Sequence, residues 1–257
     1  MNKKTLPFLL LAVVFTLVYS SCKKADEVKQ TPANQAYFPL EKGRYVIYDV
    51  DSSIWDDTNC VKVTRLYQMR WTIADTFTDG QGRPSMRIDV SIRKHAEDNW
   101  QTPTDDAVLY ATNNGQELEI AHSNLRFIKM VYPVSEGRTW EGNAYINTND
   151  ADWAFFKGWT YRYTDVDLPF GTGDVTYQHT VSVIAVDETV NDPNAQPRNT
   201  ASRAYSKEVF APGVGMVYRE YYRWTYDPNF VNNMDPNYAD TRCLKGTGVI
   251  MRAVDHN

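Results

Sequence analysis

The feature that most constrains the fold of this chain is an alternation of apolar and polar residues through most of the sequence after residue 36. Between Pro84 and Lys94, apolar residues occupy every second position and polar or charged residues occupy most positions between them. A period of two puts alternate side chains on opposite faces of a β-strand, so the pattern predicts strands with one dry and one wet face. No segment sustains the 3.6-residue period of an amphipathic helix, so helices are expected to be scarce.

Short turn-forming segments separate the predicted strands. Residues 79–82 and 113–115 both predict β-hairpins, because Gly and Asn accept the positive φ angles of tight turns. Further strands are expected at Arg126–Tyr132, Trp153–Tyr163, Val175–Val186, Tyr205–Phe210, Gly215–Tyr226 and Gly248–Val254. The pattern indicates an all-β, mainly antiparallel fold, built either as a β-sandwich or as a strongly bent half-barrel.

The first 21 residues differ from the rest of the chain and predict a cleaved signal peptide. Lys3 and Lys4 precede an apolar run at 6–18 that is shorter than the roughly 20 residues a membrane-spanning helix needs. A run of this length is typical of the h-region of a signal peptide. Cys22 follows two serines, and the stretch YSSC resembles the lipobox of bacterial lipoproteins, in which the cysteine is acylated and becomes the new N-terminus.

This resemblance implies a lipid anchor at Cys22 and an extracytoplasmic position for the residues after it. Each buried methylene contributes about 0.8 kcal/mol, so two or three acyl chains, such as palmitate, hold a soluble domain at a membrane. Residues 22–36 have Val28 as their only large aliphatic residue, and we expect a flexible tether there. Residues 37–257 would then form a β-rich domain in the bacterial cell envelope, attached to the outer membrane.

A short turn motif occurs twice, as FPLEKGR at 38–44 and as YPVSEGR at 132–138. Because Pro blocks ladder pairing and Gly permits positive φ, each copy is expected to be a turn that leads into a strand. The two copies could mark similar halves, 37–130 and 131–257, or the same turn used twice; seven residues are too few to establish a repeat, which favours the second interpretation. With FAPGVGMVY at 210–218, these turns resemble segments of uncharacterised envelope lipoproteins of the Bacteroidota, which implies a β-rich extracytoplasmic domain without a known activity.

Two cysteines lie near opposite ends of the predicted β-domain. In an oxidising compartment Cys60 and Cys243 can form a disulfide, and the alternative is two buried thiols. A bridge would close a long loop and contribute on the order of 4–5 kcal/mol in the chain-entropy model. The sequence leaves both possibilities open, because spacing along the chain does not place the two Cα atoms.

The charge of the chain argues against nucleic acid as a partner. The net charge is −5, and it becomes −7 when residues 1–21 are removed, because Lys3 and Lys4 are the only charged residues in that segment. An acidic protein is not attracted to polyanions such as nucleic acids. The expected partners are therefore the membrane, through the lipid, and a glycan or a hydrophobic ligand.

Sequence signatures of common catalytic, nucleotide-binding and metal-binding sites are absent, including GxGxxG, GxxxxGK[ST], HExxH, GxSxG and CxxC. The acidic segments 49–57 and 147–152 could offer oxygen atoms to Ca²⁺, but solvated acids in loops and turns are the stronger interpretation. No catalytic residue, metal or cofactor is therefore expected from the sequence.

Two aromatic stripes are the strongest candidates for a ligand site in this chain, which contains 17 Tyr and 7 Trp. They occupy the predicted strands at 153–163 and 215–226. An exposed stripe can stack on sugar rings or hold a hydrophobic ligand, whereas a buried stripe is simply core, which is the more common case. The candidate ligand-binding residues are Trp153, Trp159, Tyr161, Tyr218, Tyr222 and Trp224.

We therefore expect a non-catalytic envelope lipoprotein that binds a ligand or partner through a concave aromatic face or its long loops. One alternative is a hydrolase acting on envelope or dietary glycans, and another is a purely structural envelope component. A convergent pair of acids beneath an open aromatic cleft would indicate the hydrolase. Complete burial of the stripes would indicate the structural role, and an apolar cavity inside a barrel would indicate lipid carriage.

Overall fold

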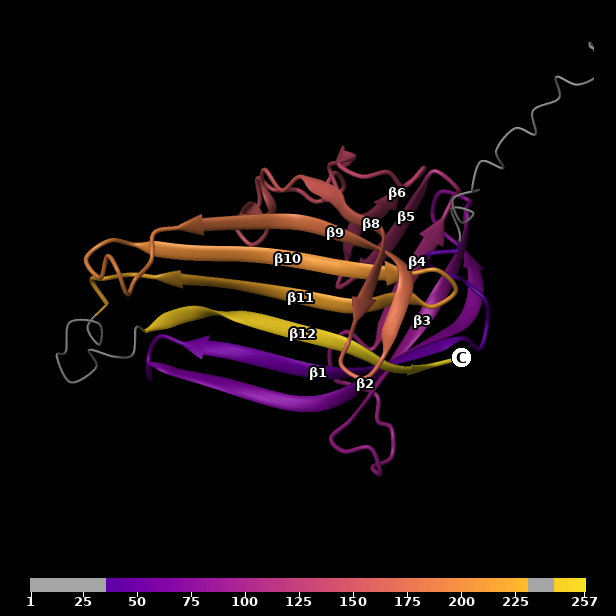
Figure 1. Ribbon diagram of the computed structural model, residues 1–257, viewed down its shortest axis with the longest axis horizontal. Helices are drawn as coiled ribbons and strands as arrows, with labels where there is room; N and C mark the ends of the chain where they lie inside the picture. The colour runs from indigo at the N-terminus through magenta and orange to yellow at the C-terminus, as the bar shows by residue number, and fades with distance from the viewer. Residues whose placement is uncertain (1–35, 231–242) are drawn as a thin grey trace, which may run out of the picture. The chain divides into compact units, whose positions relative to one another are not determined.

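The computed structural model of the protein describes residues 36–230 and 243–257. These residues form twelve strands and one short 3₁₀ helix, η1 (Ala154–Phe156), with no α-helix in the described ranges (Figure 1). The strands are β1 (Tyr45–Asp56), β2 (Val61–Thr78), β3 (Pro84–Arg93), β4 (Val108–Asn113), β5 (Glu117–His122), β6 (Leu125–Val131), β7 (Thr139–Trp140), β8 (Tyr161–Gly171), β9 (Thr176–Val190), β10 (Ala201–Ala211), β11 (Gly215–Tyr226) and β12 (Leu244–His256). The predicted signal peptide, Cys22 and nearly all of the predicted tether lie outside the described residues.

All twelve strands belong to a single antiparallel sheet with the order β6-β5-β4-β3-β2-β1-β12-β11-β10-β9-β8-β7. Strands that are consecutive in sequence pair with each other, except β6 and β7, which are the two edges of the sheet, and β1 also pairs with β12. The predicted all-β, mainly antiparallel class is therefore confirmed. Of the two predicted architectures, the bent sheet is correct and the sandwich is wrong, because one continuous sheet forms the whole fold.

The sheet bends until its edge strands β6 and β7 come together, which nearly closes it into a barrel. The N–H of Ile128 in β6 donates to the carbonyl of Gly142 at 2.8 Å, and Nε1 of Trp140 in β7 donates to the carbonyl of Ile128 at 2.9 Å. The hydroxyl of Tyr163 in β8 accepts from the N–H of Val131 at 2.9 Å and donates to its carbonyl at 2.8 Å. Side chains thus supply part of the hydrogen bonding that a regular ladder would supply at this seam.

Six strands continue past the barrel and form an extended sheet, which lies at the left of Figure 1. It comprises the ends of β2, β1, β12, β11, β10 and β9 beyond the pair Asp51 and Ile250. The strand β3 pairs with β2 only from Gln68 onward, so β2 is an edge strand in this region. We call the face of this sheet that carries Trp224 the outward face, and the face that carries Arg219 the inner face.

The core fills the barrel, and the alternation of β3 shows how the sequence produces it. Met86, Ile88 and Val90 are buried, while Arg87 and Asp89 lie on the other face of the same strand. Each strand contributes one apolar face in this way, and the wall of the barrel closes around these side chains. Both predicted hairpins are confirmed, since Thr78 and Pro84 pair across one turn and β4 and β5 pair across the other.

The two copies of the Gly-Arg turn make the same backbone contacts. In the turn at 43–44, the glycine N–H donates to the carbonyl of Ile73 and the N–H of Ile73 donates to the arginine carbonyl, both at 2.8 Å. In the turn at 137–138, Tyr163 makes the same two bonds, both at 3.0 Å. In each half of the chain the partner lies on the second of six consecutive strands: Ile73 is on β2 of β1–β6, and Tyr163 is on β8 of β7–β12. The division into two halves stays a prediction; the observation that supports it is that both halves begin with the same turn.

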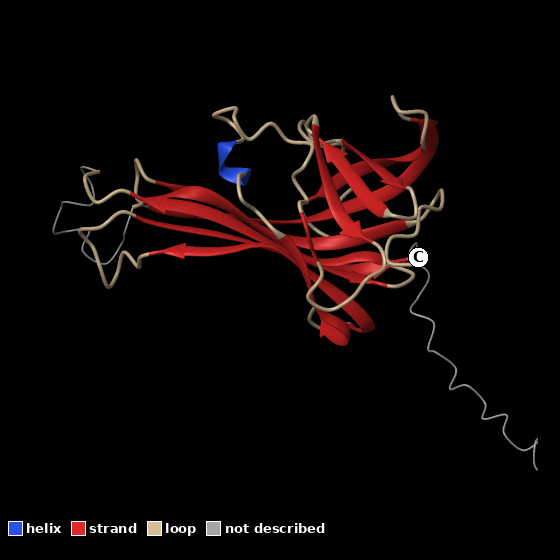
Figure 2. Ribbon diagram, turned by 90° about the horizontal axis from the view of Figure 1, so that it is seen from above, coloured by secondary structure: helices blue, strands red, loops and turns tan. Residues whose placement is uncertain are grey.

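The predicted strand Trp153–Tyr163 is wrong in its first part, because η1 occupies its start and β8 begins only at Tyr161. The aromatic residues here pack against one another instead of alternating along a strand; Phe156 and Trp159, for example, meet edge to face with their ring centroids 4.9 Å apart. This segment lies along one side of the long strands in Figure 2, where Phe155 covers the Arg223 guanidinium at 3.8 Å. The described ranges contain no helix with the length and hydropathy to cross a membrane.

Candidate functional site

The structure separates the two predicted aromatic stripes. Trp159 and Tyr161 are core residues, with 6% and 2% of their surface exposed. Trp153 is half-buried and stacks on Phe156, with 6.5 Å between the ring centroids. Trp159 and Tyr161 therefore belong to the core, and of the three candidates in the first stripe Trp153 alone presents part of its ring to solvent.

The second stripe lies on the outward face of the extended sheet. Tyr218, Tyr222 and Trp224 occupy alternate positions of β11 and share this face with Glu220. All three aromatic residues are half-buried, so each presents part of its ring to solvent. Burial and then the hydrogen bond to Glu220 raise the pKa of Tyr218, so its hydroxyl remains a neutral donor at 2.9 Å from Glu220 Oε2.

Cross-strand pairing places Trp55 of β1 across from this stripe, with two glycines of β12 between them. Gly246 pairs with both Trp55 and Trp224, and Gly248 pairs with Tyr222. Glycine has no side chain, so the backbone of β12 forms the floor of a trough, and the Trp55 ring packs onto this floor at Gly248, which is buried. A Cβ atom at Gly248 would lie 3.0 Å from the Trp55 ring and 3.1 Å from Cβ of Tyr222, so even a methyl group would crowd this floor.

We call this trough the aromatic groove. One part has a volume of about 310 Å³ and is bounded by Trp55, Tyr222, Trp224 and Gly248. A neighbouring part of about 570 Å³ shares Trp55 and Trp224 and reaches the loop at 191–194 after β9. The two parts together give an elongated depression along the outward face, with the size of a small-molecule site.

Polar groups border the groove from both sides. The ammonium group of Lys62 lies 5.0 Å from the centre of the Trp55 ring, and the hydroxyls of Ser53 and Thr64 are hydrogen-bonded at 3.1 Å. Asp51 forms an ion pair with Arg252 at 2.9 Å. The groove thus combines apolar ring faces with hydroxyl, carboxylate and ammonium groups.

A second aromatic pair extends the platform toward β10. Tyr205 stacks on Tyr222 with 5.3 Å between the ring centroids, and the Arg203 guanidinium lies 5.1 Å from the first ring and 5.6 Å from the second. Arg203 is itself held by Asp187 at 2.6 Å. Burial first, and then the negative charges of Glu220 and Asp187, raise the pKa of Tyr205, so this ring also stays neutral.

The disulfide between Cys60 and Cys243 closes the tip of the extended sheet beside the groove. Cys60 lies in the turn between β1 and β2, and Cys243 directly precedes β12. Their Cα atoms are 4.4 Å apart, although 183 residues separate them in sequence. Of the two possibilities that the sequence left open, the structure contains the bonded form, and Cys60 lines the larger part of the groove.

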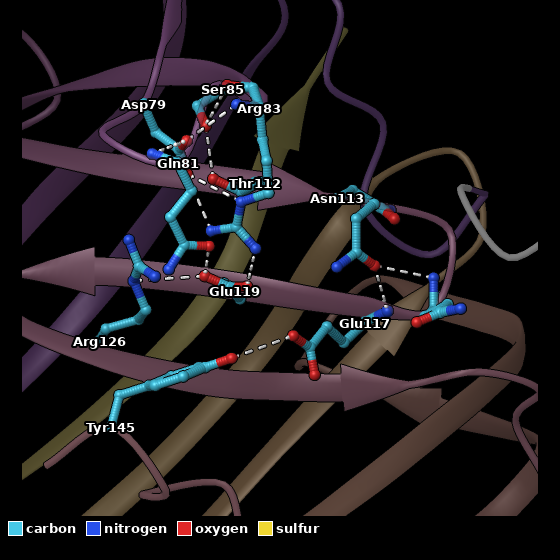
Figure 3. A network of polar contacts seen from close by, with 12 residues as sticks. Asp79, Gln81, Arg83, Ser85, Thr112, Asn113, Glu117, Glu119, Arg126 and Tyr145 are labelled. Atoms are coloured by element: carbon cyan, nitrogen blue, oxygen red, sulfur yellow. Dashed lines mark hydrogen bonds and ion pairs between the residues drawn. The ribbon is translucent and has the colours of Figure 1, made fainter.

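A pair of neighbouring acids occurs on β5, away from the groove (Figure 3). Glu119 is buried and receives hydrogen bonds from Arg83 at 2.5 and 2.9 Å, while Arg126 lies 3.3 Å away. Burial, followed by the neighbouring Glu119, raises the pKa of Glu117, whose carboxylate accepts from Tyr145 at 3.5 Å. Two arginines neutralise Glu119: Arg83 ties β5 to the β2–β3 hairpin and Arg126 ties it to β6. This pair is therefore a structural network and not an acid pair beneath an aromatic cleft.

The predicted acidic loop at 49–57 is mainly a strand, since β1 runs through Asp49, Asp51 and Asp56. The alternation of β1 turns Asp49 and Asp51 outward, and Asp56 accepts the N–H of Thr58 at 2.9 Å in the following turn. Among the described residues, no group of three or more His, Cys, Asp and Glu side chains is arranged to hold a metal ion.

Sequence reasoning missed two parts of the groove, Trp55 and the glycine floor. The signal for the floor is the Gly246-Thr-Gly248 spacing inside a strand, because glycine in a strand interior often marks close approach of another group. Trp55 carries no such local signal, since only the pairing of β1 with β12 brings it opposite β11.

Comparisons with known proteins give little further information. No family model matches the chain, and no curated protein matches it. Comparison with solved structures finds a protein from Bacteroides fragilis described as a "putative exported protein with YmcC-like fold", with 10% identity, a TM-score of 0.38 and coverage of 85% of this chain and 98% of that one. A likeness at that score carries no argument, so the interpretation of the site depends on its own geometry.

Proposed function

We propose that this protein is an exported, lipid-anchored, non-catalytic component of the bacterial cell envelope that binds a saccharide in the aromatic groove. The observation that carries this proposal is the trough in which Trp55, Tyr222 and Trp224 surround the glycine floor of β12. An open groove with aromatic walls on a rigid sheet is suited to binding, because the sheet holds the rings in place before a ligand arrives.

The chemistry of the groove favours a saccharide over a purely apolar ligand. The C–H faces of a sugar ring carry partial positive charge and stack on the negative faces of indole and phenol rings. The sugar hydroxyls then need donors and acceptors, which Ser53, Thr64 and Lys62 supply at the border. A wholly hydrophobic ligand would displace water from these polar groups without offering new hydrogen bonds, which is unfavourable.

The hydrolase alternative lacks support in the same groove. Glycoside hydrolysis uses two carboxyl groups that flank the scissile bond, separated by roughly 5–9.5 Å. Of the acids that line the groove, Asp51 is held by Arg252, Glu220 accepts from the hydroxyl of Tyr218, and Asp192 accepts from the N–H of Asn194. We therefore infer binding without bond cleavage.

A binding experiment tests the groove. The purified full chain is applied to a glycan array, and the strongest hit is titrated by isothermal titration calorimetry. Trp224→Ala should weaken binding about tenfold or more, because it removes one wall of the groove. The matched control is Trp100→Ala, whose ring lies 4.6 and 4.3 Å from the guanidinium groups of Arg70 and Arg93 and lines no part of the groove. Equal affinity of both variants for the sugar, or an array without any hit, would contradict the proposal.

The anchor is tested separately. Cells expressing the chain are labelled with an alkyne analogue of palmitate, with and without the substitution Cys22→Ala. We expect label on the wild-type chain and none on the variant, because the thiol is the acylation site in the lipobox-like segment. Equal labelling of the two chains would remove the lipid anchor and leave the groove proposal unaffected.

A further inference from the structure

A second cavity lies inside the barrel, on the side of β11 opposite the aromatic groove. It has a volume of about 190 Å³ and is bounded by residues of β2 to β6 and β10 to β12 or directly before them. Its walls are mostly apolar and include Trp71, Leu109, Phe210 and Met251. Among the residues that line it, Asp106 alone is exposed, so the cavity meets solvent on that side.

Three charged side chains meet in this apolar interior. The ammonium group of Lys129 lies 2.7 Å from Oε1 of Glu208, and only 11% and 5% of these two side chains are exposed. Nε of Arg219 lies 3.7 Å from the same carboxylate oxygen. Two cations therefore face one anion where Coulomb interactions are weakly screened, which leaves one positive charge without a partner.

The hydrogen bonding of these cations is incomplete. An ammonium group has three N–H donors, and the described residues satisfy one for Lys129, with the Phe127 ring 5.0 Å away. Nε of Arg219 is buried and has no hydrogen-bond partner among the described residues. Buried polar groups are nearly always paired, so free donors on two adjacent cations indicate that another molecule completes the site.

The remaining polar residues of the cavity do not supply the missing anion. Asp106 lies on the solvent side, where it accepts a hydrogen bond from Ser123 and is 3.9 Å from His122. Burial first, and then the positive charges of Lys129 and Arg219, lower the pKa of His122 to about 4, so its ring is neutral at physiological pH. The inner part of the cavity thus keeps a net positive charge.

We propose that this cavity binds a small amphipathic carboxylate, with the carboxylate facing Lys129 and Arg219 and the apolar part against Trp71 and Met251. A cavity of about 150 Å³ holds benzene, so about 190 Å³ suits a monocarboxylate of about six carbons. The apolar walls and the paired cations together select a molecule with one anionic end, which neither feature would do alone. This site does not depend on the aromatic groove, because it lies on the other face of the sheet.

Calorimetric titration of the purified full chain with hexanoate tests the proposal. Hexanol and hexylamine serve as probes of equal length without the negative charge. Hexanoate should bind at least about tenfold more tightly than hexanol, and hexylamine should not bind. From butyrate to hexanoate the affinity should rise about fourfold per methylene, and decanoate should bind more weakly because it exceeds the cavity. Equal affinity for hexanoate and hexanol, or no binding of either, would overturn the proposal and indicate a water-filled cavity.

Variants then assign the binding to this cavity. Arg219→Gln should weaken the binding of hexanoate at least tenfold and leave the affinity for hexanol unchanged. Arg252→Gln, on the outward face of the neighbouring strand, should change neither affinity. Val249→Phe fills the cavity without altering its charges and should abolish hexanoate binding even if Arg219→Gln fails to fold. Unchanged hexanoate binding in folded Val249→Phe would place the ligand elsewhere and contradict the proposal, whatever the sugar titrations show.

Discussion

The aromatic groove and the inner cavity use opposite faces of one strand. Tyr222 and Trp224 of β11 point to the groove, whereas Arg219 of the same strand points to the cavity. The groove is open to water and uses aromatic ring faces with polar groups at its border. The cavity is largely closed and places charges among apolar side chains. The comparison teaches that the two-residue period of a strand lets a single sheet present two chemically unrelated surfaces.

The two sites also depend on different structural supports. The groove needs the absence of side chains at Gly248 and the strand pairing next to the Cys60–Cys243 disulfide. The cavity needs the closed barrel and the ion pair of Lys129 with Glu208. Perturbing one support should therefore leave the other site intact, and the following experiments test this independence.

The largest expected effect comes from breaking the buried ion pair. Lys129→Met leaves Glu208 buried without its close partner and should lower the free energy of unfolding by about 3–5 kcal/mol. Urea denaturation followed by tryptophan fluorescence measures the change. The double variant with Glu208→Gln should recover only part of the loss, because it removes the buried carboxylate but leaves Arg219 without the anion that lies 3.7 Å from it.

The comparison predicts a contrasting result on the outward face. Asp51→Asn breaks the half-exposed pair with Arg252 and should change the free energy of unfolding by at most about 1 kcal/mol. A loss as large as that of Lys129→Met would show that the two faces do not differ in electrostatic environment.

The next effect concerns the tip of the extended sheet. Replacing Cys60 and Cys243 together by alanine should cost about 4 kcal/mol, because the bond restricts a long loop in the unfolded chain. The same variant should bind the saccharide more weakly, since Cys60 lines the larger part of the groove. At temperatures at which the variant is folded, its affinity for hexanoate should not change. Weaker binding of both the saccharide and hexanoate would show that the two sites are coupled through the sheet.

The third effect is a pH dependence of the free energy of unfolding that comes from His122, a residue that lines the cavity. The pKa of His122 is about 4 in the fold and about 6.5 in the unfolded chain, so the unfolded chain binds the proton more tightly between these values. Stability should therefore fall by about 3 kcal/mol as the pH decreases from 6.5 to 4. Urea midpoints at several pH values test this, and His122→Gln should flatten that part of the profile. An identical profile for the variant would assign the acid sensitivity to other groups.

The smallest effect is local to the groove floor. Gly248→Ala adds a methyl group 3.0 Å from the Trp55 ring and should weaken saccharide binding about tenfold by narrowing the trough. Calorimetry with the sugar and with hexanoate on the same variant separates the sites, and only the sugar should be affected. Gly80→Ala is the control, because nothing lies within 4 Å of its added Cβ. Weaker hexanoate binding would mean that the floor of the groove also shapes the cavity.

Much of the sheet could be predicted from local sequence. The segment Gly215–Tyr226 was predicted with the bounds that β11 has, and the hairpin around Asn113 was correctly placed. Alternation and turn residues act over a few positions, so they can be read directly. The aromatic segment at 153–163 was misread because η1 and its clustered aromatic rings resemble an alternating strand in composition while following a different local geometry.

The candidate sites could be predicted only in part. Tyr222 and Trp224 were found because they share one strand face, but Trp55 lies 169 residues from Trp224 and shares no local pattern with it. Lys129 and Glu208 are 79 residues apart, and each alone resembles an ordinary charged residue on a strand. Such residues become a site only when the bend of the sheet brings their strands together.

The sequence by itself determined that this chain forms amphipathic antiparallel strands, because a period of two is a property of neighbouring residues. Only the tertiary structure decided which faces meet: β1 pairs with β12 to complete the groove, and the bend of the sheet encloses two cations with one carboxylate. The physical reason is that long-range pairing depends on the packing of the whole sheet, which no short segment of the chain encodes.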